Sequence, residues 1–428
     1  MFDIFFSLLV FGIFFLLYKI NNLLYPNNKY ELVVFFYILL CSYHDYIFIN
    51  LKDLGLIDNY SIVSSWREIF IILCIAILCL KVFVKFSFNK ISIYLFLFIM
   101  LSIFLFAWGV SNSYFILDIV IGYRSYLIIP LSFLLFITMK VNINTERFIR
   151  LACLLILVPN VVMSVYQYYA IHNITDIWFI DFFVKNNTNI QEWDYFRDER
   201  FRPVGFFVST LSLCIMSIFF VVYSAVNSSF FKLKTILILV LGCIPIYLSS
   251  TRVFYLAIIY LFLILFLIKT LRNSTLSSSL IFIGGIFAPI VTLIVIYYLD
   301  LDPSSMGRID QWRTVINFSI DHPLGSGLGA LGVGLAIRPD SLLIAYIYLF
   351  GFISVVLYLL ILLFLAFRYI FVDKKLTIVA LILCYIVCFQ SVENSFYIQM
   401  TIVLFANNYA GYRFYRKSCL YNRGFQWN

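Results

Sequence analysis

The chain has 428 residues, of which 64% are hydrophobic and 12% are charged, and it carries a formal net charge of +9. Soluble proteins are roughly half apolar and about a quarter charged, so this composition is typical of a polytopic membrane protein. It excludes a separate soluble enzyme domain and a nucleic-acid-binding role for the positive charge. Many apolar runs follow the first one, so we expect the first run to be a membrane span and not a cleaved signal peptide. We expect an all-α fold in which residues 1–428 form a single integral membrane domain.

About 12 to 14 transmembrane spans are predicted from apolar windows long enough to cross roughly 30 Å of hydrocarbon at about 20 residues each. These windows leave two loops of more than thirty residues, 172–203 and 300–341. The second window runs into the polar residues Ser42, His44 and Asp45. In chain order the candidate spans are 2–18, 31–49, 67–84, 91–110, 120–139, 148–171, 204–226, 235–250, 253–268, 280–298, 342–367, 376–391 and 396–412.

The orientation of these spans follows from the charges between them, because cytoplasmic loops carry excess Lys and Arg. One side of the predicted topology holds 19 Lys and Arg residues against 3 acids, whereas the other holds 11 against 18. The first side is therefore expected to be cytoplasmic. This places the N-terminus and both long loops outside and the C-terminus inside.

The outer cations are mostly arginines. Nine of the 11 are Arg, whereas the cytoplasmic side has seven Arg and 12 Lys. Charge topology alone does not distinguish Lys from Arg, but a guanidinium forms bidentate contacts with phosphate and carboxylate. We expect some of these arginines to bind phosphate, and pairing with the outer acids is the alternative. The outer cations are Lys52, Arg67, Arg124, Lys185, Arg197, Arg200, Arg202, Arg252, Arg308, Arg313 and Arg338.

Three of the outer arginines fall at predicted membrane boundaries. Arg200 and Arg202 belong to a basic and aromatic run that directly precedes a span, so they are expected near headgroup depth. Arg252 follows Ser249-Ser250-Thr251 in a short turn between two spans. Such a turn suits a phosphate ligand held at one depth, although a lone Arg there could also snorkel to lipid headgroups.

The second long loop carries a polar helical segment and then a glycine-rich one. Arg308 and Trp312 are spaced i and i+4, and Asp310 and Arg313 are spaced i and i+3, so a helix would present them on adjacent polar faces. Residues 327–332 match G-x-G-x-x-G, but a dinucleotide site requires a preceding strand and a following helix. Close approach to a ligand or a tight return turn are the open explanations for these glycines.

No metal site is predicted. The histidines His44, His172 and His322 lack ligand spacing, and the nine cysteines form no disulfide or metal framework. Asp340 precedes the span that begins near residue 342. A carboxylate there could act as a base, and it could equally be a helix N-cap.

Taken in order, these motifs resemble the O-antigen polymerase and ligase superfamily of bacterial envelope polysaccharide assembly. The similarity covers about residues 205–370 by pattern, and the whole chain by span number and loop placement. The segments that carry it are Ser250-Thr251-Arg252, Arg308 to Trp312, the run from His322 to Gly329, and Asp340-Ser341 followed by Gly351.

The resemblance implies a GT-C-like membrane enzyme whose outer loops bind undecaprenyl-diphosphate-linked sugars through loop arginines. Ligases of this superfamily carry His-Asn or His-Ser where this chain has Asp340-Ser341, which favours a polymerase of the Wzy type. The expected activity is a metal-independent, cofactor-independent glycosyl transfer at the outer face of the bacterial plasma (inner) membrane. The implied partners are the lipid-linked oligosaccharide, membrane lipid and a chain-length regulator protein.

The predicted site follows from this activity. Asp340, or else His322, would accept the proton of the acceptor hydroxyl, and Arg252 would stabilise the charge that develops on the diphosphate. The predicted substrate-binding residues are Arg200, Arg202, Arg308, Trp312, Arg313, Gly325, Gly327 and Gly329.

Two rival functions stay open. One is an O-antigen ligase with the same fold and a different acceptor. The other is a flippase or transporter of lipid-linked sugars, which would tend to carry ionisable residues in mid-membrane and internal repeats. Most predicted spans have uncharged centres, and we find no repeat.

The topology can be tested by cysteine labelling in a background without native cysteines. An impermeant thiol reagent added to intact cells should label cysteines placed at Asn187 and Ser305, in the two long loops. Cysteines at Lys234 and Lys374 should react only after the membrane is permeabilised. Protection of both loop positions in intact cells would overturn the orientation.

Overall fold

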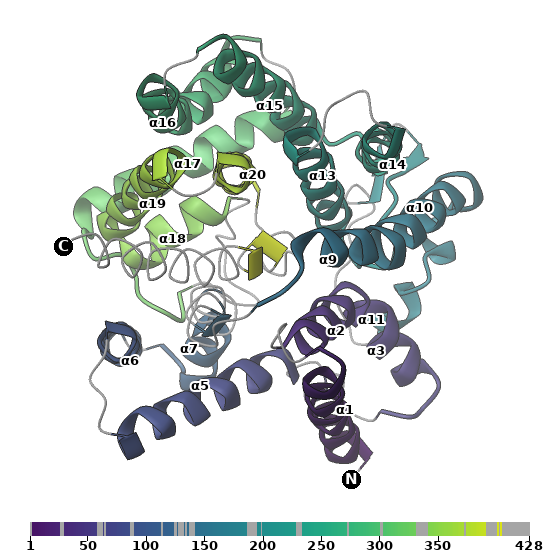
Figure 1. The fold of residues 1–428 in the computed structure, drawn as a ribbon. Helices are drawn as coiled ribbons and strands as arrows, with labels where there is room; N and C mark the ends of the chain where they lie inside the picture. The colour runs from purple at the N-terminus through teal and green to yellow at the C-terminus, as the bar shows by residue number, and fades with distance from the viewer. Residues whose placement is uncertain are drawn as a thin grey trace, which may run out of the picture. The chain divides into compact units, whose positions relative to one another are not determined.

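In the computed structural model of the protein, the described part of the chain is almost entirely helical (Figure 1). Its only strands are the two-residue β1 and β2, so the all-α expectation is confirmed for these residues. Most of the predicted spans 120–139 and 396–412 lie outside them. The described residues are 2–25, 30–57, 63, 66–85, 90–112, 114–123, 126, 132, 135–136, 142–185, 195–197, 199–227, 233–271, 274–299, 303–330, 341–371, 374–390, 400–401 and 403–404.

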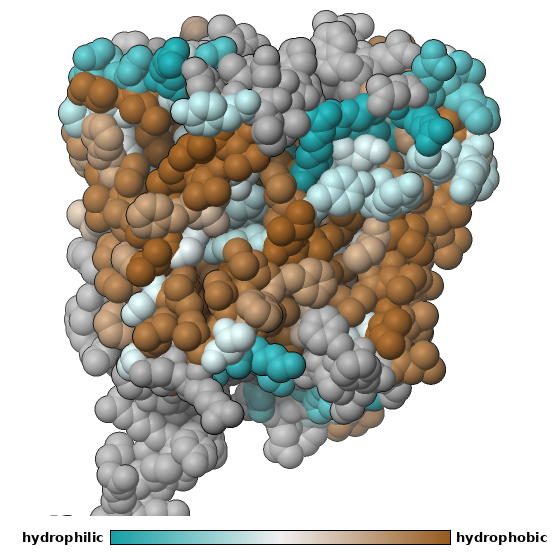
Figure 2. All heavy atoms as spheres, turned by 90° about the horizontal axis from the view of Figure 1, so that it is seen from above, coloured by the Kyte–Doolittle hydropathy of each residue, from teal (hydrophilic) through white to brown (hydrophobic). Residues whose placement is uncertain are grey.

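Several of the described helices are long and apolar enough to cross a membrane. Four satisfy this test alone, and a bent pair of helices makes a fifth. Apolar residues cover most of the described surface on the face shown in Figure 2, and hydrophilic residues gather towards its edges. A multi-pass helical membrane protein is therefore supported, while the larger span number stays a prediction. The four helices are Thr145–Ala170, Arg252–Thr270, Thr275–Val295 and Phe352–Ile370.

The described elements divide into two compact units. The first comprises residues 1–76, 132–254 and 395–428, and the second comprises residues 77–131 and 255–394. Helices α5 (Trp66–Lys85) and α15 (Arg252–Thr270) begin in the first unit and continue into the second. The first unit also contains α1 (Phe2–Leu24), α2 (Glu31–Ser42), α3 (His44–Asp53), α9 (Thr145–Ala152), η2 (Cys153–Leu157), α10 (Val158–Ala170), η3 (Ile174–Asp176), α11 (Ile180–Lys185), β1 (Phe196–Arg197), β2 (Arg200–Phe201), α13 (Thr210–Asn227) and α14 (Leu233–Ser249).

The second unit is built around α16, which contacts α17, α19 and α20. Its core includes Val315 of α17 packed with Ile344 and Ile347 of α18. The elements of this unit are α6 (Lys90–Ser111), α7 (Ile116–Gly122), α16 (Ser274–Leu299), α17 (Pro303–Asp321), α18 (Leu342–Phe350), α19 (Phe352–Phe371) and α20 (Lys374–Val387).

The predicted span 31–49 is not one straight helix. It is broken at Tyr43 into α2 and α3, which meet at an angle of 61°. His44 begins α3 and is buried, and its Nδ1 accepts a hydrogen bond of 3.0 Å from the Trp66 indole. The polar residues that interrupt this apolar window therefore mark a break in the helix.

The predicted span 204–226 begins later than expected, because residues 204–209 are not helical and α13 begins at Thr210. Buried side chains of α10 provide hydrogen-bond partners for this non-helical backbone. The Gln167 amide oxygen accepts from the N–H groups of Val204 (3.0 Å) and Gly205 (2.8 Å), and its nitrogen donates to the Gly205 carbonyl (2.9 Å). The Asn160 side chain accepts from the Phe206 N–H (3.0 Å). Non-helical backbone at membrane depth requires such internal partners.

Contacts inside the first unit agree with the predicted alternation of sides. Arg147 Nε lies 3.7 Å from Glu31 Oε1, and the charge pattern assigns both residues to the cytoplasmic side. Arg197 donates a hydrogen bond of 2.9 Å to the Ser250 carbonyl, and both of these residues are assigned to the outer side. Which side faces outward stays a prediction.

The predicted span 342–367 is also broken. Helix α18 ends at Phe350, Gly351 follows it with φ 61°, and α19 begins at Phe352. A Cβ at Gly351 would lie 1.9 Å from the Pro323 carbonyl oxygen, so only glycine fits. The Phe352 N–H donates to the same carbonyl at 3.1 Å. Because Gly351 has no side chain, the loop after α17 can pack against the break between α18 and α19.

Candidate functional site

In the first unit, the basic and aromatic run before α13 folds into a two-stranded hairpin. Strands β1 and β2 pair antiparallel, with Phe196 opposite Phe201 and Arg197 opposite Arg200. Glu199 adopts φ 64° in the turn, a conformation that few non-glycine residues take. Phe201 is only 1% exposed, and its burial anchors the hairpin to the unit.

Two arginines of this hairpin hold the turn between α14 and α15. Arg197 donates to the Ser250 carbonyl at 2.9 Å. Arg202 donates from Nε to the Ser249 carbonyl and from Nη2 to the Thr251 hydroxyl, each at 3.0 Å. These bonds use donors that could otherwise meet a diphosphate, so Arg202 has a structural role in addition to its predicted binding role.

Arg200 and Arg252 are more accessible. Both are exposed, and Arg200 Nη1 makes a hydrogen bond of 3.2 Å with the Tyr168 hydroxyl. Arg252 is the first residue of α15, where the positive end of the helix dipole disfavours a cation. The helix dipole therefore does not explain an arginine at this position.

In the second unit, residues 308–313 are helical as predicted and belong to α17. The Trp312 ring stacks on Phe389 with centroids 6.3 Å apart and packs against the cluster around Val315. Trp312 therefore anchors α17 to its unit. Arg313 is exposed, and the side chain of Arg308 lies outside the described residues.

The glycine-rich segment after α17 is a tight return loop. Gly325, Gly327 and Gly329 have φ of 75°, 84° and 103°, respectively, and all three are buried. The N–H groups of Ser326 and Gly327 donate, each at 2.9 Å, to the carbonyls of Tyr348 and Leu349 at the end of α18. Two N–H groups of this segment are thus already bonded to the chain's own backbone, which supports the return-turn explanation. The substrate-binding role of the glycines stays a prediction.

A second contact holds this loop against α6 and the segment that follows it. The Asn112 side chain donates to the Ser326 carbonyl at 2.8 Å, and a Cβ on Gly329 would lie 2.8 Å from the Tyr114 Cβ. Burial, with a smaller effect from Tyr348, raises the pKa of the Tyr114 phenol.

The predicted proton acceptors fall at the two ends of this loop. His322 is exposed, and its ring lies 4.5 Å from that of Phe318. Asp340 lies outside the described residues, but the N-cap of α18 is Ser341, whose hydroxyl accepts from the Ile344 N–H at 3.3 Å. The helix therefore has a cap without Asp340.

The site residues belong to different units. Arg200, Arg202 and Arg252 fall in the first unit, which brings their segments together, whereas Arg308, Arg313 and His322 fall in the second. Sequence reasoning missed Asn160 and Gln167, which are 0% exposed and hold the segment that follows the hairpin. The available signal was their polarity within an apolar window, since polar residues inside membrane spans usually have a specific partner.

Comparisons of the chain with protein-family models, with characterised proteins and with solved structures find no match. Within the described residues, no group of three or more His, Cys, Asp or Glu side chains could hold a metal ion.

The role of the glycine loop can be tested with Gly327→Ala. The left-handed backbone costs a non-glycine residue about 1–2 kcal/mol, and the added Cβ would lie 2.7 Å from Trp108 Cδ1. Forced displacement in a packed region typically costs roughly 1–3 kcal/mol more. We expect a clearly lower melting temperature for the purified protein.

The matched control is Gly307→Ala, where a Cβ would meet nothing within 4 Å. If Gly327→Ala melts like this control, the packing role of the loop is wrong.

Proposed function

We propose that this chain is a polysaccharide polymerase that joins undecaprenyl-diphosphate-linked oligosaccharide repeat units at the outer face of the bacterial plasma membrane. The observation that carries the proposal is a concentration of arginines next to apolar helices, on the side predicted to face outward. Arg200 and Arg252 are both exposed in the first unit, and hairpin bonds hold the turn beside Arg252. A diphosphate at the end of a membrane-embedded lipid is the ligand that such a site would take.

The proposed reaction needs no nucleotide, because the leaving group is already a diphosphate. The acceptor hydroxyl attacks the anomeric carbon of the donor, a new C–O bond forms, and the bond from that carbon to the diphosphate oxygen breaks. The hydroxyl proton passes to a base, for which we propose the Asp340 carboxylate. Negative charge gathers on the departing diphosphate, where guanidinium groups are most effective.

A transporter is the candidate from another class, and one observation favours it. The helix break between α2 and α3 carries buried His44 and, directly after it, Asp45, and transporters often bind ions or substrates at such breaks. However, His44 accepts from Trp66, and Asp45 accepts from the Val208 N–H at 3.4 Å with Arg67 nearby. These contacts give both residues a structural use, so we prefer the polymerase over the transporter. An O-antigen ligase would share the same donor chemistry.

The arginines can be tested by single replacement of Arg252, Arg308 and Arg313 with Lys. Lys keeps the charge but loses the bidentate fork, so we expect little surface polymer and a normal protein level. Polymer is read from gel profiles of surface polysaccharide. The control is Arg150→Lys, because Arg150 is exposed on the side predicted to be cytoplasmic and pairs only loosely with Glu146 at 3.9 Å. A normal amount of polymer in all three outer variants would show that these arginines do not bind the diphosphate and serve only in surface ion pairs.

The base can be tested with Asp340→Asn. Because Ser341 caps α18, loss of the Asp340 charge should leave the fold intact. Asn cannot accept the proton, so we expect the polymer ladder to disappear while lipid-linked single repeat units accumulate. His322→Ala, compared at equal protein abundance, tests the other acceptor. A normal ladder in the Asn variant would exclude Asp340 as the base.

A further inference from the structure

The span Thr145–Ala170 contains one irregular turn in the first unit. Its middle, Cys153–Leu157, is the π-helical turn η2, and Pro159 follows at the start of α10. A proline inside a helix has no N–H to donate, and its ring crowds the carbonyl four residues earlier, here that of Leu155. Hydrocarbon supplies no donor, so this carbonyl needs a partner from elsewhere in the chain.

The Tyr43 side chain supplies that partner. Its hydroxyl donates to the Leu155 carbonyl at 2.6 Å, across 112 residues of sequence. Tyr43 is also the residue at which α2 ends and α3 begins, with an angle of 61° between the two helices. One hydrogen bond therefore joins the two helix interruptions and replaces the donor that Pro159 lacks.

The same two interruptions hold the non-helical segment before α13. Asn160 directly follows Pro159, and its amide nitrogen donates to the Ile156 carbonyl at 2.9 Å while its oxygen accepts from the Phe206 N–H at 3.0 Å. From the other side, the Phe206 ring lies 5.1 Å from the ring of Tyr43. Phe206 is thus fixed by both α10 and the break between α2 and α3.

Beyond this point, the outer part of α10 holds the arginine hairpin. Gln167 bonds the backbone of residues 204 and 205, which directly follow the hairpin, and the Tyr168 hydroxyl bonds Arg200 at 3.2 Å. Arg202 in turn bonds the 249–251 turn that precedes Arg252. The direction in which α10 leaves η2 therefore determines where these arginines lie within the first unit.

From this series of contacts we infer that Tyr43 is a positioning residue. By holding the Leu155 carbonyl, it fixes the direction of α10 and, through α10, the places of Arg200 and Arg252. The inference rests on the proposed function for what these two arginines do. The bland alternative is that Tyr43 only provides a hydrogen bond to a buried carbonyl. The two roles are separable, because an N–H at position 159 would serve the carbonyl from within an uninterrupted helix.

The test compares Tyr43→Phe, Pro159→Ala and the double variant as purified full-length proteins. Loss of the hydroxyl leaves the Leu155 carbonyl without its donor, so Tyr43→Phe should melt about 2–4 °C lower than the parent. In the double variant the new N–H should restore the melting temperature to that of the parent or above it. The matched control is Tyr166→Phe, the same chemical change at a residue of α10 that is 63% exposed.

Surface polymer, compared at equal protein abundance, separates positioning from mere stability. Misplaced binding groups can cost up to about a hundredfold in rate, so we expect about tenfold less polymer from Tyr43→Phe and from the double variant. Polymer that returns together with the melting temperature in the double variant overturns the inference. A double variant that melts as low as Tyr43→Phe also overturns it, because the Leu155 carbonyl would then not be the group through which Tyr43 acts.

Hydrogen–deuterium exchange gives a readout that does not depend on polymer. If α10 changes direction, the amides of residues 204–206 lose their bonds to Asn160 and Gln167 and should exchange about fivefold faster or more in the double variant. Exchange equal to that of the parent overturns the inference and leaves the polymerase standing. Faster exchange in a protein whose gene deletion leaves surface polymer unchanged supports the positioning role of Tyr43 and excludes the polymerase.

Discussion

Hydrocarbon provides no hydrogen-bond partners, so non-helical backbone that lies within the membrane needs partners from the chain's own side chains or from another helix end. The first unit meets this requirement with Gln167 and Asn160, whose buried amides serve residues 204–206. The second unit meets it with the end of α18, whose carbonyls accept from the glycine-rich loop. Both irregular segments adjoin predicted site residues. The polar contacts that permit them therefore also determine where the site residues can lie within each unit.

The same requirement divides the outer arginines by task. A guanidinium has five N–H donors and no acceptor, so an arginine can hold a turn and still carry charge towards a ligand. Arg197 and Arg202 bond the carbonyls and the hydroxyl of the 249–251 turn, whereas Arg200 and Arg252 are exposed. Lysine could not replace Arg202 without loss of its two-pronged contact with Ser249 and Thr251. Part of the excess of Arg over Lys on this side thus has a structural cause.

Composition and apolar windows predicted the fold class and most helices, because both depend on local sequence. The predicted spans were wrong where a single residue breaks the helix within an apolar window. The breaks at Tyr43 and Gly351 depend on partners far along the chain, Trp66 and Pro323, which no local pattern contains. The helical face of residues 308–313 was predictable from spacing. The choice of Ser341 as the cap of α18, one residue after the acid, was not, because Asp and Ser cap helices about equally well.

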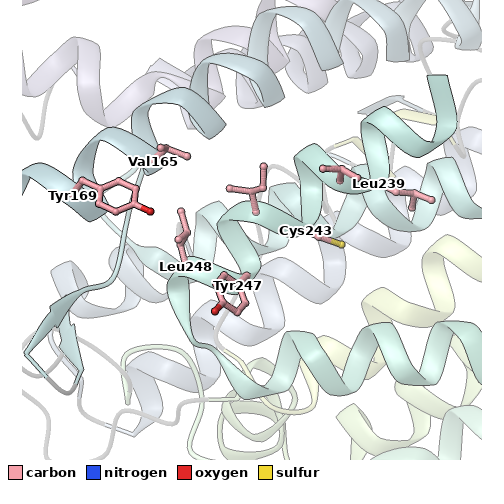
Figure 3. Close-up of a pocket in the computed structure, with 8 residues that line it drawn as sticks. Val165, Tyr169, Leu239, Cys243, Tyr247 and Leu248 are labelled. Carbon is pink, nitrogen blue, oxygen red and sulfur yellow. The ribbon is translucent and has the colours of Figure 1, made fainter. Parts of the chain in front are cut away.

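The end of α14 needs hydrogen-bond partners, and the hairpin provides them. Its last carbonyls, at Ser249 and in the following turn, are left without helical partners, and Arg197 and Arg202 fill that need. Residues between Leu239 and Leu248 of the same helix line one wall of an apolar groove of about 520 Å³, whose other wall is α10 (Figure 3). One helix therefore carries both the arginine-bound turn and one wall of the apolar groove.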